Sequence, residues 1–183
     1  MLTFLVSVSA LCQNQTIDSI KNVVEKLENS SQKIQAVQKL LEISQNYQNT
    51  SLKDAIDYAT LAKDISLKIN YDEGLGSSYR FLGNYYKKLG KYPESIDAWL
   101  DGLEIFTRMK DLVGQSIIYN NIGGMYSDQG QEAKALDYYS QALKLGEQAK
   151  DKKRVVTTLS NIGNTYLNSA AANKKALGIH LRA

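Results

Sequence analysis

Cysteine, histidine and proline are almost absent from this chain of 183 residues, which has one of each. A single cysteine excludes a framework of disulfide bonds and a zinc site built from cysteines. With a single histidine, a histidine-based metal site or a catalytic triad is not expected. Because proline interrupts helices, the one proline, together with 12 tyrosines, favours a helical chain.

The chain also lacks a block of like charges. Its 22 lysine and arginine residues and 19 acidic residues are interspersed and leave a net charge of +3, so a dedicated nucleic-acid surface is not expected. Hydrophobic residues make up 43% of the chain and charged residues 22%. That composition provides enough apolar surface to offset the entropy of ordering, and it predicts a folded chain of about one domain.

The N-terminus has an apolar run of ten residues, from Leu2 to Leu11. It is too short to cross a bilayer, which takes about 20 residues, but it has the length of the apolar region of a signal peptide. We therefore expect residues 1–12 to be a signal peptide and the protein to be exported to the periplasm or cell envelope. No basic residue precedes the run, so the alternatives are a chain start placed a few residues late, or a frayed helix in a cytoplasmic protein. Lipid attachment at Cys12 is a weaker alternative, because Leu11 is bulky.

A hexapeptide recurs three times along the chain with a fixed spacing. Its copies are FLGNYY at 81–86, NIGGMY at 121–126 and NIGNTY at 161–166, so their glycines are 40 residues apart. A fixed period of 20–50 residues indicates a solenoid of stacked repeats. The pattern predicts repeats at about 31–72, 73–111, 112–151 and 152–183, the last one incomplete, preceded by a single helix at about 16–30.

Each repeat is predicted to be a pair of antiparallel helices. In the best-preserved repeat, apolar residues from Leu75 to Leu89 recur every three or four positions, as on one face of a helix. Gly90 then ends this helix, and Pro93 is tolerated in the first turn of the next one. Short turns of this kind imply antiparallel helices. In the last repeat we expect the turn at residues 169–174.

Glycines lie in the middle of the first helix of three repeats, at Gly83, Gly123 and Gly163. Each should cost about 1 kcal/mol relative to alanine. We therefore expect the backbone of a neighbouring helix to come too close to these positions for a Cβ.

The signature of Leu or Ile, then Gly, then Tyr three residues later, then Ala or Ser nine further on resembles the tetratricopeptide repeat family in its forty-residue variety. The match is strong over about 74–183, moderate over 31–73, where Ile43 and Asn46 replace the signature Gly and Tyr, and absent before residue 30. The resemblance implies an all-α fold, a right-handed α–α superhelix of about four helix hairpins. Its concave side would be lined by the first helix of each repeat and would bind extended peptides or protein segments.

Carried over by position, the resemblance places a peptide-binding face on the first helices. Its candidate residues are Arg80, Asn84, Lys87, Asn120, Asn121, Ser160, Asn161 and Asn164, within a wider inward-facing set that adds Ser77, Lys88, Ile117, Gly124, Asp128, Thr157 and Asn168. Asparagine has both a donor and an acceptor, so a row of asparagines can bind peptide main chain of any sequence. Alternatively, the asparagines bond neighbouring helices or solvent. The basic residues either bind a carboxylate or form an ordinary charged helix face.

No arrangement of residues predicts catalysis, a cofactor or a metal. His180 falls where Trp99 and Tyr139 fall in the earlier repeats, so it is expected to pack in the interior. We therefore expect a non-enzymatic module that binds a protein or an extended peptide, with neither nucleic acid nor a small-molecule substrate as its partner.

The listed chain stops partway along the expected second helix of its last repeat, without the polar cap that solenoids need. We expect either an output domain further along a longer chain or self-association through the uncapped end. Exported repeats of this variety resemble the input regions of bacterial membrane-anchored signalling proteins, such as sensor kinases, nucleotide cyclases and transcriptional regulators. A free-standing envelope adaptor that scaffolds a protein complex is the alternative.

Overall fold

The computed structural model describes the backbone of residues 17–180 and the side chains of residues 17–168. Over this range the chain forms eight α-helices and no β-strand, which confirms the all-α class. In chain order the helices are α2 (Ile17–Glu25), α3 (Ser30–Tyr47), α4 (Leu52–Lys68), α5 (Asp72–Lys88), α6 (Tyr92–Arg108), α7 (Leu112–Asp128), α8 (Glu132–Gln148) and α9 (Lys152–His180). None of these helices has the length and hydrophobicity that crossing a membrane requires. The expected signal peptide at residues 1–12, with Cys12, and the side chain of His180 lie outside the described part of the chain.

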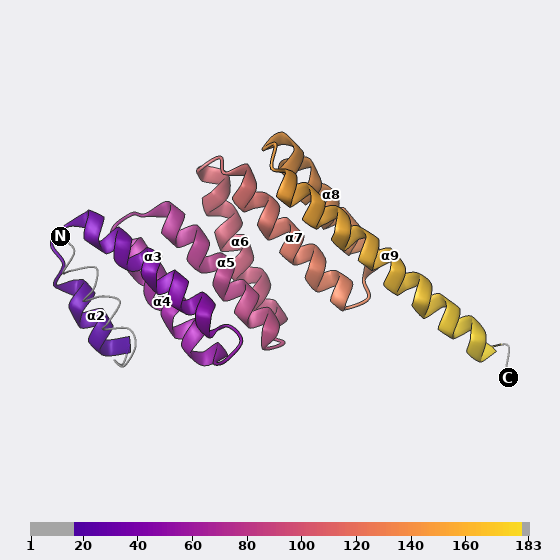
Figure 1. The fold of residues 1–183 in the computed structure, drawn as a ribbon, viewed down its shortest axis with the longest axis horizontal. Helices are drawn as coiled ribbons and strands as arrows, with labels where there is room; N and C mark the ends of the chain where they lie inside the picture. The colour runs from indigo at the N-terminus through magenta and orange to yellow at the C-terminus, as the bar shows by residue number, and fades with distance from the viewer. Residues whose placement is uncertain (1–16, 181–183) are drawn as a thin grey trace. The chain divides into compact units, whose positions relative to one another are not determined.

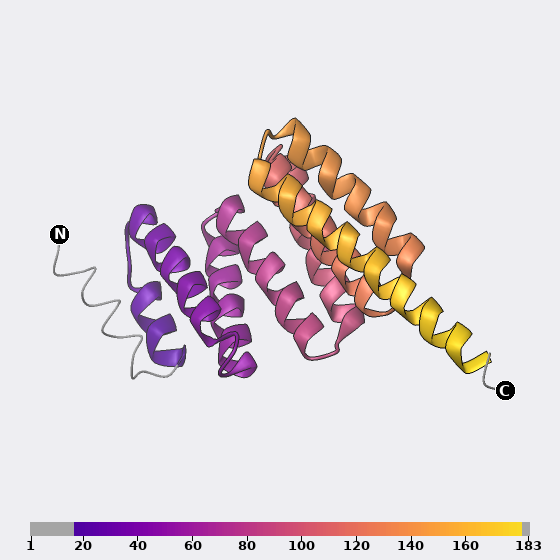
Figure 2. The ribbon, with the colours of Figure 1, turned by 45° about the vertical axis from the view of Figure 1, so that its right-hand side comes forward.

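The chain divides into two compact units, Met1–Met109 and Lys110–Ala183. In the first unit α3 packs against α4 and α5 against α6, and in the second unit α7 packs against α8. The two helices of each pair lie side by side in Figures 1 and 2 and are joined by a short turn. These three pairs are the predicted helix hairpins. The last helix, α9, packs against α8 and, over a smaller contact, α7.

Glycines in the left-handed conformation terminate α5 and α7. Gly90 has a φ of 73° and Gly130 a φ of 70°, values that glycine adopts without steric cost. The N–H of the residue after each glycine bonds back into the last helical turn, from Lys91 to the carbonyl of Tyr86 at 2.9 Å in the first case. The expected stop at Gly90 is confirmed, and the next helix starts within a few residues.

Gly83 and Gly123 each face an aromatic ring of the following helix. A Cβ on Gly123 would lie 2.8 Å from Cδ1 of Tyr139, and a Cβ on Gly83 would overlap the indole of Trp99. Trp99 is 0% exposed and Tyr139 is 2% exposed, so both rings are buried in the space that the glycines leave. The expected close approach is confirmed at these two positions, but its nearest neighbour is a ring and not the expected backbone.

The last predicted turn is absent, because α9 runs without interruption from Lys152 to His180 (Figure 2). The prediction of tight packing at Gly163 is also wrong, since a Cβ there would have nothing within 4 Å. The sequence supplies a reason for the continuous helix. The position 40 residues after Gly130 is Ala170, and alanine is the residue that favours helix most. The fourth repeat is therefore one long helix in the described residues.

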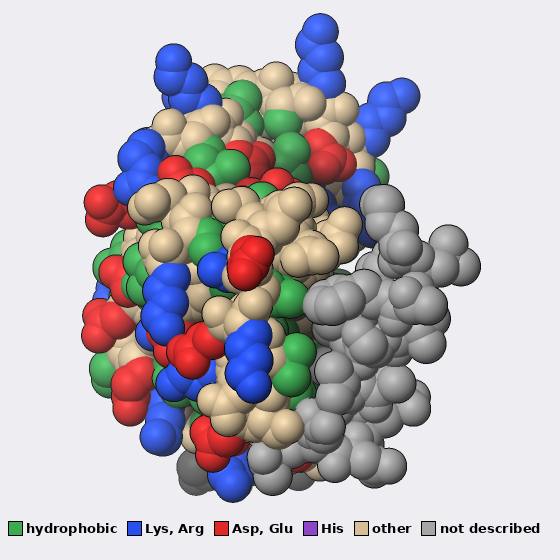
Figure 3. Space-filling view, turned by 90° about the vertical axis from the view of Figure 1, so that its left-hand side faces the viewer, with side chains coloured by type: hydrophobic (Ala, Val, Ile, Leu, Met, Phe, Trp, Pro, Cys, Tyr) green, Lys and Arg blue, Asp and Glu red, His purple; other side chains and the backbone are tan. Residues whose placement is uncertain are grey.

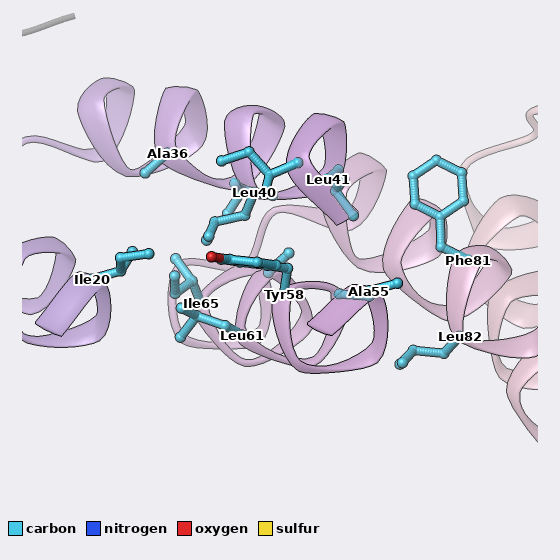
Figure 4. Packing of buried hydrophobic residues seen from close by; sticks show 14 of the residues in the cluster. Ile20, Ala36, Leu40, Leu41, Ala55, Tyr58, Leu61, Ile65, Phe81 and Leu82 are labelled. Carbon is cyan, nitrogen blue, oxygen red and sulfur yellow. The ribbon is translucent and has the colours of Figure 1, made fainter. Parts of the chain in front are cut away.

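The core of the first unit extends from α2 through α5. Ile20 and Val24 bring α2 onto this core, and Tyr58 and Phe81 lie farther along it (Figure 4). A buried polar contact joins the first helices of neighbouring repeats, because the hydroxyl of Tyr85 lies 2.9 Å from Oγ of Ser44. Burial raises the pKa of Tyr85 above its ordinary value, and the hydrogen bond with Ser44 opposes this shift. This packing fixes the orientation of α5 and hence the direction of its partly exposed face.

Candidate functional site

The candidate residues of the first unit lie along one face of α5. Arg80, Asn84 and Lys87 follow one another at spacings of four and three, which places them on the same side of the helix, and each is partly exposed. Oδ1 of Asn84 accepts a hydrogen bond of 3.1 Å from Nε1 of Trp99. The guanidinium carbon of Arg80 lies 4.3 Å from the centre of the Phe81 ring, a cation–π contact. This face is therefore basic, and two of its three side chains are positioned by neighbouring aromatic residues.

Lys88, from the wider inward-facing set, is engaged by the turn between α3 and α4. Its Nζ lies 3.2 Å from the carbonyl oxygen of Gln48 and 3.1 Å from Oδ1 of Asn49. A lysine that bridges two repeats in this way stabilises their packing. The structure thus separates Lys88 from the predicted ligand face.

In the second unit two of the predicted asparagines bond to each other. Nδ2 of Asn161 on α9 donates a hydrogen bond of 3.0 Å to Oδ1 of Asn120 on α7. The residue 80 positions before Asn161 is Phe81, which is 7% exposed in the core of the first unit. The same register position thus carries an apolar contact in one repeat and an amide bond in another. Of the two interpretations of these asparagines, bonding between helices applies to this pair.

The remaining candidates of the second unit surround this pair. Ser160 and Asn164 are exposed and lie four residues apart on α9, while Asn121 on α7 is partly buried. Oγ of Ser160 donates to the carbonyl of Val156 within its own helix, at 2.9 Å. The second unit therefore combines one fixed amide pair with exposed polar side chains on the adjoining turn of α9.

A polar cavity that the sequence pattern does not indicate lies between α4, α5 and α6. Its volume is about 260 Å³, and its lining includes Asp72, Tyr79, Asp101, Glu104 and Arg108. The Arg108 guanidinium and the Asp72 carboxylate form an ion pair of 2.6 Å at its rim. Burial raises the pKa of Asp101, and the nearby acidic side chains, Glu104 among them, add to the effect. The spacing of Asp97, Asp101 and Glu104 along α6 was the only sequence signal for this acidic surface.

Groups suited to catalysis or metal binding are not evident in the described part of the chain. No three histidine, cysteine, aspartate or glutamate side chains among the described residues are placed to hold a metal ion. Lys and Arg side chains alternate with Asp and Glu on the surface that Figure 3 shows, as their interspersed order in the sequence predicts. The polar faces on the first helices are thus suited to hydrogen bonding and charge pairing with a ligand chain.

Known proteins agree with a class of stacked helix hairpins. Residues 114–183 match the sequence model of the family described as tetratricopeptide repeat. These residues include nearly all of α7 and the whole of α8 and α9. With the same hairpin pattern in α3 to α6, the chain is a tetratricopeptide-repeat protein. Curated proteins include no match to its sequence.

Several solved structures share the fold. BtubC (BKLC) from P. vanneervenii is 17% identical, with a TM-score of 0.68 over 84% of this chain and 64% of its own. Aspartyl phosphate phosphatase F from Bacillus subtilis is 16% identical, with a TM-score of 0.72 over 86% of this chain and 41% of its own. A putative kinesin light chain from Podosopora anserina with nearly identical TPR-like repeats is 14% identical, with a TM-score of 0.58 over 91% of this chain and 82% of its own. At these identities the likeness is one of fold. The chain spans less than two thirds of the length of the first two.

Proposed function

We propose that this chain is a non-catalytic module that binds a protein or an extended peptide along the first helices of its repeats. The observation that carries the proposal is the amide pair of Asn120 and Asn161, bonded at 3.0 Å between α7 and α9. Polar side chains of Asn121, Ser160 and Asn164 lie on the same two helices. A repeat fold supplies the scaffold that holds such side chains at fixed positions.

An extended peptide leaves its backbone N–H and C=O groups without partners, so a surface that binds it has to supply both donors and acceptors. A primary amide has two N–H groups and a carbonyl oxygen with two lone pairs. One hydrogen bond between Asn120 and Asn161 uses only part of this capacity. Because the pair is already oriented, less side-chain entropy is lost when a ligand binds.

The basic face of α5 suits a different part of the ligand. Arg80 and Lys87 lie on the same side of the helix, and charge-assisted hydrogen bonds to carboxylates are about twice as strong as neutral ones. We infer that acidic side chains or a terminal carboxylate of the ligand pair with this face.

The test is an array of synthetic extended peptides, probed with the full chain and with its Asn121→Ala and Asn164→Ala variants. We expect the affinity of each peptide found to fall about tenfold in the variants, the effect of losing one hydrogen bond. Asn22→Ala is the matched control, because Asn22 is exposed on α2, away from these helices. Thermal melting of each variant verifies folding. Peptides that bind the two variants as tightly as the native chain, or an array without any binding peptide, would contradict the proposal.

We propose further that the module is the sensor or interaction region of a longer, exported bacterial signalling protein. The apolar run at residues 2–11 supports export, and the shares of 64% and 41% show that similar folds occur within longer chains. A free-standing envelope adaptor is the second candidate. A gene that encodes a membrane-spanning helix and a catalytic domain after Ala183 would select the sensor, whereas a stop after one polar helix would select the adaptor. Residues 1–16 fused to a reporter that is active only outside the cytoplasm test export, and an inactive fusion would oppose it.

A further inference from the structure

The last helix of the described chain has two faces, and only one of them is covered. Toward α7 and α8 it buries Thr158, which is 1% exposed, and Thr165, which is 4% exposed. On another side it presents the α9 stripe, which we define as Val156, Leu159, Gly163 and Tyr166. Val156 is 62% exposed, Leu159 49% and Tyr166 53%, and the space at Gly163 is open.

The same stripe is covered on α7. The residues 40 positions before the α9 stripe are Ser116, Tyr119, Gly123 and Tyr126. The helix that covers them is α8: the ring of Tyr139 fills the space at Gly123, and the ring of Tyr138 stacks on Tyr126 with 5.4 Å between centroids. Oγ of Ser116 donates to the carbonyl of Ala142 at 2.7 Å.

The corresponding stripe of α5 is also covered. It consists of Gly76, Tyr79, Gly83 and Tyr86, and the covering helix is α6, whose Trp99 ring fills the space at Gly83. In both repeats the cover is therefore an amphipathic helix that places an aromatic ring against the central glycine. Within the described residues, α9 has the stripe and the open glycine without the helix.

We propose that the α9 stripe is a docking surface for an acidic amphipathic helix of a partner protein, which packs as α8 packs on α7. The partner helix places an aromatic ring in the open space at Gly163. It places a small residue opposite Val156, because Val156 is bulkier than Ser116, the residue at this position on α7. On α8 the small residue near Ser116 is Gly146.

Charge complementarity determines that the occupant is an acidic partner. From residue 152 to residue 183 the chain has six basic residues and no acidic one. They are Lys152, Lys153, Arg154, Lys174, Lys175 and Arg182. Packing of two copies through α9, in either relative direction, would bring these like charges together. The covering helix α6, in contrast, carries Glu94, Asp97, Asp101 and Glu104 on its exposed surface. A helix with such acidic residues is attracted to α9, whereas a second α9 is repelled.

The experiment uses a peptide taken from this chain. The probe is the α8 sequence, Glu132–Gln148, with the changes Lys134→Glu and Lys144→Glu and a fluorescent label, and its binding to the full chain is followed by anisotropy. We expect binding that a Tyr139→Ala change in the peptide weakens about thirtyfold, the effect of losing a central aromatic contact. The unmodified α8 peptide should bind more weakly than the acidic one, and the difference should shrink at high salt.

Variants of the full chain locate the binding. Gly163→Phe fills the open space and should abolish binding, and Leu159→Asp should do the same. Leu100→Asp is the matched control, because Leu100 is 50% exposed on α6, and it should leave binding unchanged. Circular dichroism verifies that each variant is folded.

Four results would overturn the proposal. The first is the absence of binding by the acidic peptide, and the second is binding that persists in Gly163→Phe. The third is a concentration-dependent dimer in sedimentation that Leu159→Asp dissociates, which would identify a second copy as the occupant. The fourth is binding that appears only after Leu177→Asp, which would identify the chain's own C-terminal residues as the cover.

Discussion

At the scale of single residues, the effect of a mid-helix glycine depends on what faces it. Gly123 and Gly163 occupy the same position in consecutive repeats. A Cβ on Gly123 would lie 2.8 Å from the buried ring of Tyr139, whereas a Cβ on Gly163 would meet nothing within 4 Å. The same substitution should therefore have opposite effects at the two sites.

We predict that Gly163→Ala stabilises the chain by about 0.5–1 kcal/mol, because alanine loses less backbone entropy in a helix. Gly123→Ala should destabilise it by about 1–2 kcal/mol, because the Tyr139 ring has to move in a closely packed interior. Unfolding in urea, followed by circular dichroism, gives both free energies. Equal effects of the two substitutions, in either direction, would show that the space at the two glycines does not differ as described.

At the scale of helices, the turns depend on individual stop residues. Gly90 and Gly130 take the left-handed conformation at the ends of α5 and α7, and Ala170 occupies the next position of this series. Because no such stop is present, α9 continues to His180. A proline should therefore be tolerated at the start of a helix in one repeat and not in the middle of α9.

We predict that Ala171→Pro lowers the helix content of the chain, because proline inside a helix removes a hydrogen bond and costs about 3 kcal/mol. Ala133→Pro is the matched control. It lies 40 residues after Pro93, in the first turn of α8, where proline is tolerated. Far-UV circular dichroism and amide hydrogen exchange of residues 165–180 measure the outcome. Unchanged exchange in Ala171→Pro would indicate a turn near residue 171 and would contradict a continuous α9.

Periodicity was sufficient to predict the hairpins, since the positions of Gly83, Gly123 and Gly90 fix the register and one helix end. It could not predict the partners of polar side chains across repeats. Asn120 and Asn161 are 41 residues apart, one more than the period, so a pattern that aligns residues at 40 does not pair them. The bond between Asn84 and Trp99 was hidden for a similar reason, since each residue had been assigned to a different role.

At the scale of the whole molecule, buried tyrosines are distributed over both units. Tyr85 in the first unit is 1% exposed and Tyr139 in the second is 2% exposed. Burial is the largest cause that raises the pKa of each phenol above its ordinary value of 10.0. Twelve tyrosines in one chain therefore make its stability sensitive to alkaline pH.

The sign of this dependence follows from the raised pKa values of the folded state. Below pH 10 the two phenols are neutral in both states and their contribution to stability is fully present. As the pH rises toward the folded-state pKa, the unfolded chain loses protons that the folded chain retains, so the free energy of unfolding falls.

We predict that Tyr85→Phe makes this alkaline decline shallower, because phenylalanine keeps the buried ring and has no proton to lose. At neutral pH the same variant should be less stable, by about 1 kcal/mol, because Ser44 loses its partner at 2.9 Å. Urea unfolding of the native chain and the variant between about pH 8 and pH 11 separates the two effects. The neutral-pH loss displaces the whole curve, whereas ionisation changes its slope. Parallel curves for the two chains would show that Tyr85 does not contribute to the alkaline decline.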